Sequence, residues 1–177
     1  REAYNIFGSN GILFNHESPR RGETFVTKKI IKALVRIKMG YQKQLVLGNL
    51  DSKRDWGHAK DYVEAMWKIL QQKKPDDYVI ATGKQYSIRQ FISFVAKKLN
   101  MKISWKGKGL NETGYDVLNK KNIILVNKSY IRPLDVNTLL GNAAKARREL
   151  KWKPKINIHT LIDEMIMEEM NILGNDQ

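Results

Sequence analysis

The sequence predicts an α/β fold, because short apolar runs alternate with longer segments whose apolar residues recur every three to four positions. Glycine, proline and asparagine separate these segments, as expected where one element ends and the next begins. Strands are expected at residues 11–14, 44–47, 78–81, 102–105 and 123–126. Helices are expected at residues 25–39, 61–72, 88–99, 143–150 and 159–173. The helices become denser toward the C-terminus, and no internal repeat is present.

Helical spacing and cap residues support the first helices. Between residues 25 and 39, apolar side chains at positions 26, 30, 34 and 37 share one face, with Thr24 as the expected cap and Gly40 as the expected stop. In the helix 61–72, Asp61 is expected to cap the start, and one face carries Val63, Met66, Trp67 and Leu70.

Similar signals define the later elements. Ser87 is expected to cap the helix 88–99, which turns Phe91, Val95 and Leu99 inward. Asn142 is expected to cap the helix 143–150. Residues 107–121 are polar and contain glycine, which predicts a mobile loop. Residues 1–7 are expected to be the end of a helix.

Composition excludes several classes of protein. The chain has 177 residues, close to one domain, and no cysteine, so it has no disulfide or thiolate chemistry and suits a cytoplasmic setting. No apolar run is long enough to cross a membrane, and no signal peptide is visible. Residue 1 is Arg1, which we expect not to be a translation start. The net charge of +14 invites nucleic-acid binding, but the lysines are dispersed, so we expect neither a nucleic-acid nor a membrane partner.

The most informative segment is the loop after the first strand. It reads Asn15-His16-Glu17-Ser18-Pro19-Arg20-Arg21-Gly22. Open α/β folds bind ligands where strands end, and guanidinium groups match phosphate oxygens. A solvated arginine pair in an ordinary connection is the structural alternative.

Two further segments carry an arginine in a suggestive setting. Arg54-Asp55-Trp56 precedes the helix that begins near residue 61, whose N-terminal dipole favours an anion. Arg132-Pro133-Leu134-Asp135 forms an arm that proline keeps out of helical geometry, with a guanidinium for a phosphate and a carboxylate for ribose hydroxyls. Surface ion pairs and a proline turn are the structural alternatives for these two segments.

Together the three motifs resemble the GDP-mannose 4,6-dehydratases, which are extended short-chain dehydrogenases/reductases. The resemblance covers this whole chain but only the C-terminal half of such an enzyme. It implies the last strands of a Rossmann-type parallel sheet together with the smaller helical nucleotide-sugar-binding domain, across residues 1–177. The N-terminal cofactor-binding half of the Rossmann fold is absent from the sequence, so we expect a truncated or split enzyme.

The resemblance also implies an activity and a set of site residues. The parent lyase converts GDP-mannose to GDP-4-keto-6-deoxymannose with NADP as the hydride carrier. By position, His16 and Arg21 contact NADP, and Asn15 contacts the substrate. Substrate contacts are also implied for four further residues, namely Lys29, Arg54, Arg132 and Asp135. Family members usually carry glutamate, which is one methylene longer, at the position of Asp135.

The groups that perform the chemistry are missing from this sequence. None of its seven tyrosines has a lysine four residues later, so the Tyr-x-x-x-Lys pair of the family is absent. No glycine-rich dinucleotide turn and no metal-ligand spacing of histidines is present. We therefore expect this chain alone to lack catalytic residues, and to work with a missing N-terminal half or within a homo-oligomer of the parent enzyme. A related epimerase or reductase fragment and a basic nucleic-acid-binding module remain as alternatives.

Overall fold

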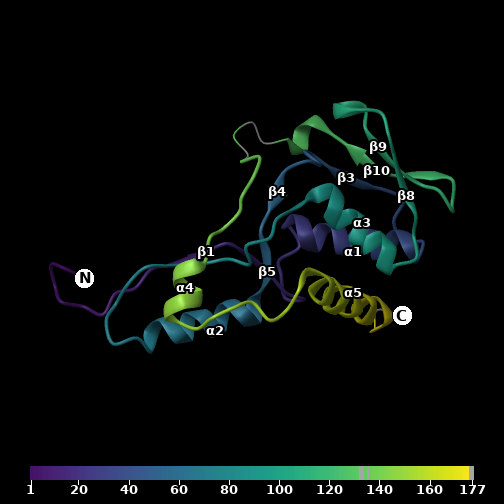
Figure 1. The fold of residues 1–177 in the computed structure, drawn as a ribbon. Coiled ribbons are helices and arrows are strands. Elements are labelled where there is room, and N and C mark those ends of the chain that lie inside the picture. The colour runs from purple at the N-terminus through teal and green to yellow at the C-terminus, as the bar shows by residue number, and fades with distance from the viewer. Residues whose placement is uncertain (132–133, 135, 176–177) are drawn as a thin grey trace. The chain divides into compact units, whose positions relative to one another are not determined.

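The computed structural model describes residues 1–131, 134 and 136–175, and these residues form two compact units (Figure 1). Unit 1 is made of Arg1–Ser18, Arg54–Tyr86 and Leu139–Leu161. Unit 2 is made of Pro19–Lys53, Ser87–Thr138 and Ile162–Gln177, apart from the undescribed positions. The chain therefore passes between the units repeatedly, and neither unit is one continuous segment.

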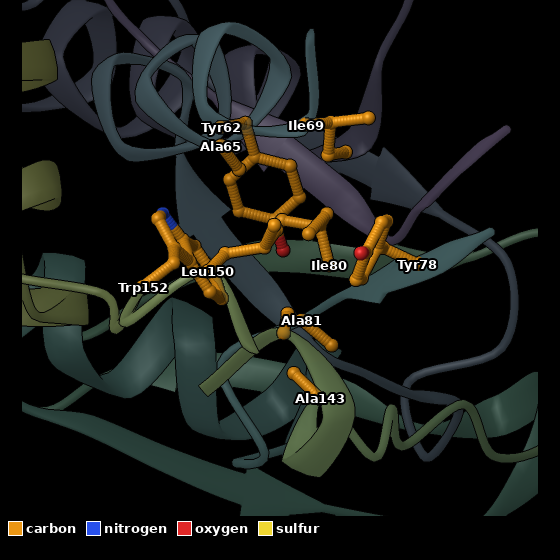
Figure 2. Packing of buried hydrophobic residues seen from close by; sticks show 10 residues of the cluster. Tyr62, Ala65, Ile69, Tyr78, Ile80, Ala81, Ala143, Leu150 and Trp152 are labelled. Atoms are coloured by element: carbon orange, nitrogen blue, oxygen red, sulfur yellow. The ribbon is translucent and has the colours of Figure 1, made fainter. Parts of the chain in front are cut away.

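Unit 1 contains two pairs of short parallel strands. Strand β1 (Gly11–Leu13) pairs with β6 (Tyr78–Ile80), and β2 (Asn15–Glu17) pairs with β5 (Trp56–His58). Helix α2 (Ala59–Leu70) contacts all four strands, and α4 (Ala144–Glu149) contacts β6. Figure 2 shows the core that these elements enclose, in which Tyr62 and Trp152 are the largest fully buried side chains.

Unit 2 combines helices with a four-stranded mixed sheet. Its sheet order is β3 (Leu45–Leu47), β10 (Lys121–Val126), β9 (Thr113–Asp116) and β8 (Ile103–Lys106), with β3 and β10 parallel and the rest antiparallel. Helices α1 (Val26–Lys38) and α3 (Ile88–Lys98) contact each other, and two short 3-10 helices, η1 (Gly109–Asn111) and η2 (Lys128–Tyr130), flank the sheet. Strands β4 (Lys53–Arg54) and β7 (Tyr86–Ser87) and helix α5 (Ile158–Asn175) span the boundaries between units.

The α/β class and most of the expected elements are confirmed. Ser87 caps α3 as expected, and its hydroxyl accepts from the Gln90 backbone while the Gln90 side chain accepts from the Ser87 backbone. Phe91, Val95 and Leu99 are buried, as the spacing predicts. No helix in the described part of the chain is long and apolar enough to cross a membrane.

Two expectations about segments are wrong. Residues 1–7 form a turn and extended chain rather than a helix end, and Asn5 has a positive φ that a helix cannot contain. Residues 107–121 are not a loop throughout, because β9 lies within them and pairs with both β8 and β10. Gly107 makes the turn possible: its φ is +77°, and a Cβ there would lie 2.3 Å from the Asn111 carbonyl oxygen.

Some caps and one helix face also differ from expectation. Phe25, not Thr24, is the N-cap of α1, without a side-chain hydrogen bond. His58 caps α2, because its ring accepts from the Lys60 backbone N–H, and Asp61 lies in the first turn instead. Ala143 occupies the N-cap of α4, although the Asn142 side chain accepts from the Ala144 backbone.

The face of α2 on which the sequence places its apolar residues is exposed. Val63, Met66, Trp67 and Leu70 lie at the surface, whereas Tyr62, Ala65 and Ile69 are buried. The helix thus carries two apolar faces, and the described residues cover only one of them.

Candidate functional site

Asp55 anchors the motif that follows strand β4. Its side chain is fully buried, and its carboxylate accepts hydrogen bonds from the backbone N–H and hydroxyl of Thr82 at 2.9 and 2.6 Å. It also accepts from the backbone N–H groups of Gly83 and Gly141 at 2.9 and 3.3 Å. Several donors satisfy the buried charge, so Asp55 holds three segments of unit 1 together.

Gly57 allows a tyrosine ring to lie directly against strand β5. A Cβ at Gly57 would lie 2.4 Å from Cε2 of Tyr62 and 3.0 Å from its hydroxyl oxygen, closer than atoms can approach. Because β2 and β5 pair with His16 opposite Gly57, the Tyr62 ring also reaches His16. The His16 and Tyr62 rings stack with centroids 4.8 Å apart and planes inclined by 24°.

This stacking orients the imidazole of His16. The Nδ1 atom of His16 lies 2.8 Å from the Phe14 carbonyl oxygen, which can only accept, so Nδ1 carries the hydrogen. In the neutral ring, Nε2 is then the acceptor. Asn15 and His16 are both partly exposed on β2 and so remain accessible to a ligand.

The Tyr62 hydroxyl is buried without a hydrogen-bond partner among the described residues. Burial raises the pKa of Tyr62, and the nearby carboxylates of Asp55, Asp61 and Glu17 raise it further. Tyr62 therefore stays neutral at physiological pH, and its ring stacks against His16.

The two loop arginines differ in environment. Arg20 is exposed, and the Arg21 guanidinium lies 3.5 Å from the centroid of the Phe25 ring. Behind the loop, the ammonium of Lys28 is 3.3 Å from the buried carboxylate of Glu169 and also donates to the Pro19 carbonyl. Lys28 therefore fixes the base of the loop, where Arg20 is exposed and Arg21 is partly buried, with its Nε atom out of contact with solvent.

Lys29 lines a pocket of about 270 Å³ in unit 2. Its ammonium lies 3.9 Å from the centroid of the Tyr130 ring, and burial lowers the pKa of Lys29. Leu45, Val46, Gln42 and Gln44 also line this pocket, as do Glu23 and Lys32, whose charges are paired with each other at 2.6 Å. A flat, polar ring bearing negative charge nearby suits such a lining, because it can contact the apolar wall and meet the ammonium.

Backbone contacts join two of the three sequence motifs. A Cβ at Gly48 would lie 2.2 Å from the Tyr130 carbonyl oxygen, so this approach requires glycine. Beyond the undescribed positions, the Lys53 N–H donates to the Asn137 carbonyl at 2.8 Å. Tyr130 and Asn137, on either side of Arg132, therefore both contact the stretch of residues 48–53 that leads directly into Arg54.

The expected site residues thus have different outcomes. Asn15 and His16 lie on β2, Arg54 ends β4, and Lys29 faces a pocket, whereas Arg132, Pro133 and Asp135 lie outside the described residues. The convergence of Arg54 and Arg132 on one diphosphate stays a prediction. No cluster of candidate metal ligands occurs in the described part of the chain.

Sequence reasoning missed four residues that shape these sites, namely Gly48, Gly57, Tyr62 and Tyr130. Gly48 and Gly57 lie on either side of the Arg54-Asp55-Trp56 motif, and Tyr130 lies two residues before Arg132.

A family model for GDP-mannose 4,6-dehydratase matches residues 1–165, which is most of the sequence. The chain belongs to the GDP-mannose 4,6-dehydratase family. It is 51% identical to GDP-mannose 4,6 dehydratase 2 of Caenorhabditis elegans, with 99% of this chain and 46% of that protein covered. It is 47% identical to the GDP-mannose 4,6 dehydratase of Homo sapiens, with 98% of this chain and 46% of that protein covered. The chain spans about half the length of the curated relatives it matches.

Solved structures of other proteins have a fold similar to that of this chain. The structure of RMD from Pseudomonas aeruginosa complexed with NADPH matches with a TM-score of 0.73 at 20% identity, covering 92% of this chain and 48% of that one. A UDP-glucuronic acid 4-epimerase from Bacillus cereus, in complex with UDP-glucuronic acid and NAD, also matches with a TM-score of 0.73 at 17% identity, covering 97% and 48%. Here too the match is to about half of each structure.

Proposed function

We propose that this chain supplies the nucleotide-sugar side of a GDP-mannose 4,6-dehydratase. The Lys29–Tyr130 pocket supports this proposal most strongly, because a residue expected to meet the nucleotide faces a cavity beside an aromatic ring and two amides. We assign the guanine base and the adjoining phosphates to this pocket. Asn15, Arg54, Arg132 and Asp135 complete the proposed contacts to GDP-mannose.

The backbone ties support the proposed diphosphate contacts. Gly48 lies close against the Tyr130 carbonyl and the Lys53 N–H donates to the Asn137 carbonyl, on either side of Arg132, and Lys53 directly precedes Arg54. Two guanidinium groups on the same oxygens would neutralise much of the diphosphate charge.

His16 and Arg21 suit the phosphate-bearing part of NADP, which is the cofactor we propose. The imidazole of His16 is held by Tyr62 and Phe14, and the Arg21 guanidinium offers donors for a phosphate. NADP, when bound in the whole enzyme, supplies the uptake and return of hydride. The residues of this chain bind and orient, and the acid–base groups come from elsewhere. We also propose a cytoplasmic setting, which the lack of cysteine fits, and a homo-oligomeric parent enzyme.

Calorimetric titration with GDP tests this proposal. Arg54→Ala and Arg132→Ala are each expected to lose about 1.5–3 kcal/mol of binding free energy, the usual scale for a hydrogen bond to a charged group. Lys29→Ala is expected to weaken binding on a similar scale. Lys97→Ala, an exposed change on α3 outside the motifs, is the matched control and should have no effect. Equal small losses in all four variants would indicate diffuse charge attraction and would favour a nucleic-acid partner.

A further inference from the structure

The pocket beside Lys29 contains a carboxylate that a phosphate site does not explain. Glu23 lines this pocket together with Lys29 and Lys32, two lysines of helix α1. The Lys32 ammonium donates to the Glu23 carboxylate at 2.6 Å, and this hydrogen bond lowers the pKa of Glu23, so Glu23 is ionised at neutral pH. A carboxylate repels a diphosphate, and the two lysines without it would form a stronger anion site. The acid therefore needs another explanation.

The two lysines of the pocket have different partners. Lys29 and Lys32 are three residues apart, so they share one face of α1. The Lys29 ammonium lies 3.9 Å from the centroid of the Tyr130 ring, whereas the Lys32 ammonium bonds Oε1 of Glu23. The Glu23 side chain is 68% exposed, which leaves its carboxylate accessible to a ligand. The Glu23–Lys32 pair thus presents hydrogen-bond acceptors and donors side by side at the pocket.

Guanine has an edge that matches this pair. Its N1–H and N2–H groups donate, and the neighbouring O6 accepts. Each carboxylate oxygen has two lone pairs, so Glu23 can accept from N1–H and N2–H while it keeps its bond to Lys32. An ammonium has three hydrogens, so Lys32 can donate to O6 as well. Adenine has an acceptor at N1 and a 6-amino donor instead, which would face the carboxylate and the ammonium with the wrong polarity.

We propose that the Glu23–Lys32 pair recognises the base of the nucleotide and selects guanine over adenine. This inference rests on the proposed function, because it places the nucleotide in this pocket. It also orients the ligand. The base edge meets Glu23, and the phosphates lie away from that carboxylate, because like charges repel. Both residues are then determinants of substrate specificity, and the acid in a lysine-lined pocket is explained.

Calorimetric titration of the chain with GDP, inosine diphosphate and ADP tests the assignment. Inosine diphosphate lacks only the 2-amino group of GDP, so it should bind roughly tenfold more weakly, the loss of one hydrogen bond to a charged group. ADP should bind more weakly still. Glu23→Gln should lower GDP affinity roughly tenfold and raise ADP affinity, because an amide can donate to adenine N1 and accept from its 6-amino group. Lys32→Met should weaken GDP and inosine diphosphate alike by removing the donor to O6.

The sign of the Glu23→Gln effect separates base recognition from simple charge. If Glu23 only added negative charge to an anion site, its neutralisation should strengthen the binding of GDP and ADP equally. Asp163→Asn is the matched control. It neutralises another acid of unit 2 that pairs with a lysine at 2.6 Å, namely Lys98, and neither residue lines the pocket. This variant should leave the ratio of GDP to ADP affinity unchanged.

The outcomes distinguish this inference from the proposed function. Equal changes in GDP and ADP affinity in Glu23→Gln, or equal binding of GDP and inosine diphosphate by the unmodified chain, would overturn the inference. If Lys29→Ala and Arg54→Ala still weaken GDP binding in that case, the proposed function stands and only the assignment of the base edge fails. A chain that binds none of the three nucleotides would refute the proposed function, and the inference with it.

Discussion

Substituting Gly57 by alanine should disrupt the support of His16. The added Cβ would lie 2.4 Å from Cε2 of Tyr62, whereas carbon atoms normally meet at about 3.5–4.0 Å. The ring or strand β5 must therefore move by about 1 Å. Tyr62 has no free space to move into, because it is fully buried. Its ring stacks on that of His16 and meets the Trp152 ring edge to face, with the Tyr62 and Trp152 centroids 6.1 Å apart.

The expected cost follows from these contacts. Overpacking of a filled core costs about 1–3 kcal/mol, and each weakened aromatic contact adds about 0.5–1.5 kcal/mol. We therefore expect Gly57→Ala to lower the free energy of unfolding by about 2–3 kcal/mol. For a chain of this size, that corresponds to a fall in Tm of about 5–10 °C.

Thermal and urea unfolding measure this effect against two comparison variants. Gly174→Ala, in α5 with no atom within 4 Å of the added Cβ, should change stability by less than about 1 kcal/mol. Tyr62→Phe removes a buried hydroxyl that has no partner among the described residues, so it should be neutral or stabilising. A Gly57→Ala protein that unfolds like Gly174→Ala would refute the packing argument.

Two further predictions concern lysines of unit 2. Lys28→Met should cost about 3–5 kcal/mol of stability by leaving the Glu169 carboxylate buried and unpaired, and Glu169→Leu in addition should restore most of that loss. Lys98→Met breaks an exposed pair and should cost less than about 1 kcal/mol in the same urea titrations; equal losses at both sites would contradict this difference. Burial lowers the pKa of Lys29 below the ordinary lysine value of 10.5. Lys29 should therefore be charged at neutral pH and lose its charge, together with GDP affinity, at a lower pH than an ordinary lysine as the pH rises. Lys29→Arg stays charged and should keep its affinity across that range, and parallel loss in both proteins would exclude Lys29 as the cause.

Local patterns predicted much of the fold from the sequence. The capping box at Ser87 was recognisable because both of its partners lie within four residues. The helices were recognisable from their apolar spacing. Strand β9 was missed because it is stabilised by pairing with β8 and β10, and a polar sequence with glycine shows no sign of such pairing.

Helix α2 shows a different limit of sequence reasoning. Both of its faces are apolar, so periodicity identified a helix but could not tell which face the chain itself covers. Its cap was also misassigned, since Asp61 is instead buried and accepts from the backbone N–H groups of Lys155 and Ile156. Those contacts join residues more than ninety positions apart and leave no local pattern.

The candidate site was predictable in its charges but not in its supports. Lys29 and His16 could be named from their motifs, whereas their aromatic neighbours Tyr130 and Tyr62 become evident only in the folded chain. A glycine that permits close approach, such as Gly48, is likewise recognisable only when the approaching backbone is known.

Turnover of GDP-mannose tests most directly the claim that this chain binds the nucleotide sugar while another segment performs the chemistry. The measurement is formation of 4-keto sugar from GDP-mannose and NADP by the purified chain, alone and after co-expression with the complementary stretch of the C. elegans relative. The chain alone should form no product, because it has no Tyr-x-x-x-Lys pair and no glycine-rich turn. The co-expressed pair should form product, and Arg54→Ala should reduce it. Turnover by the chain alone above that of a mock-purified control would contradict the account.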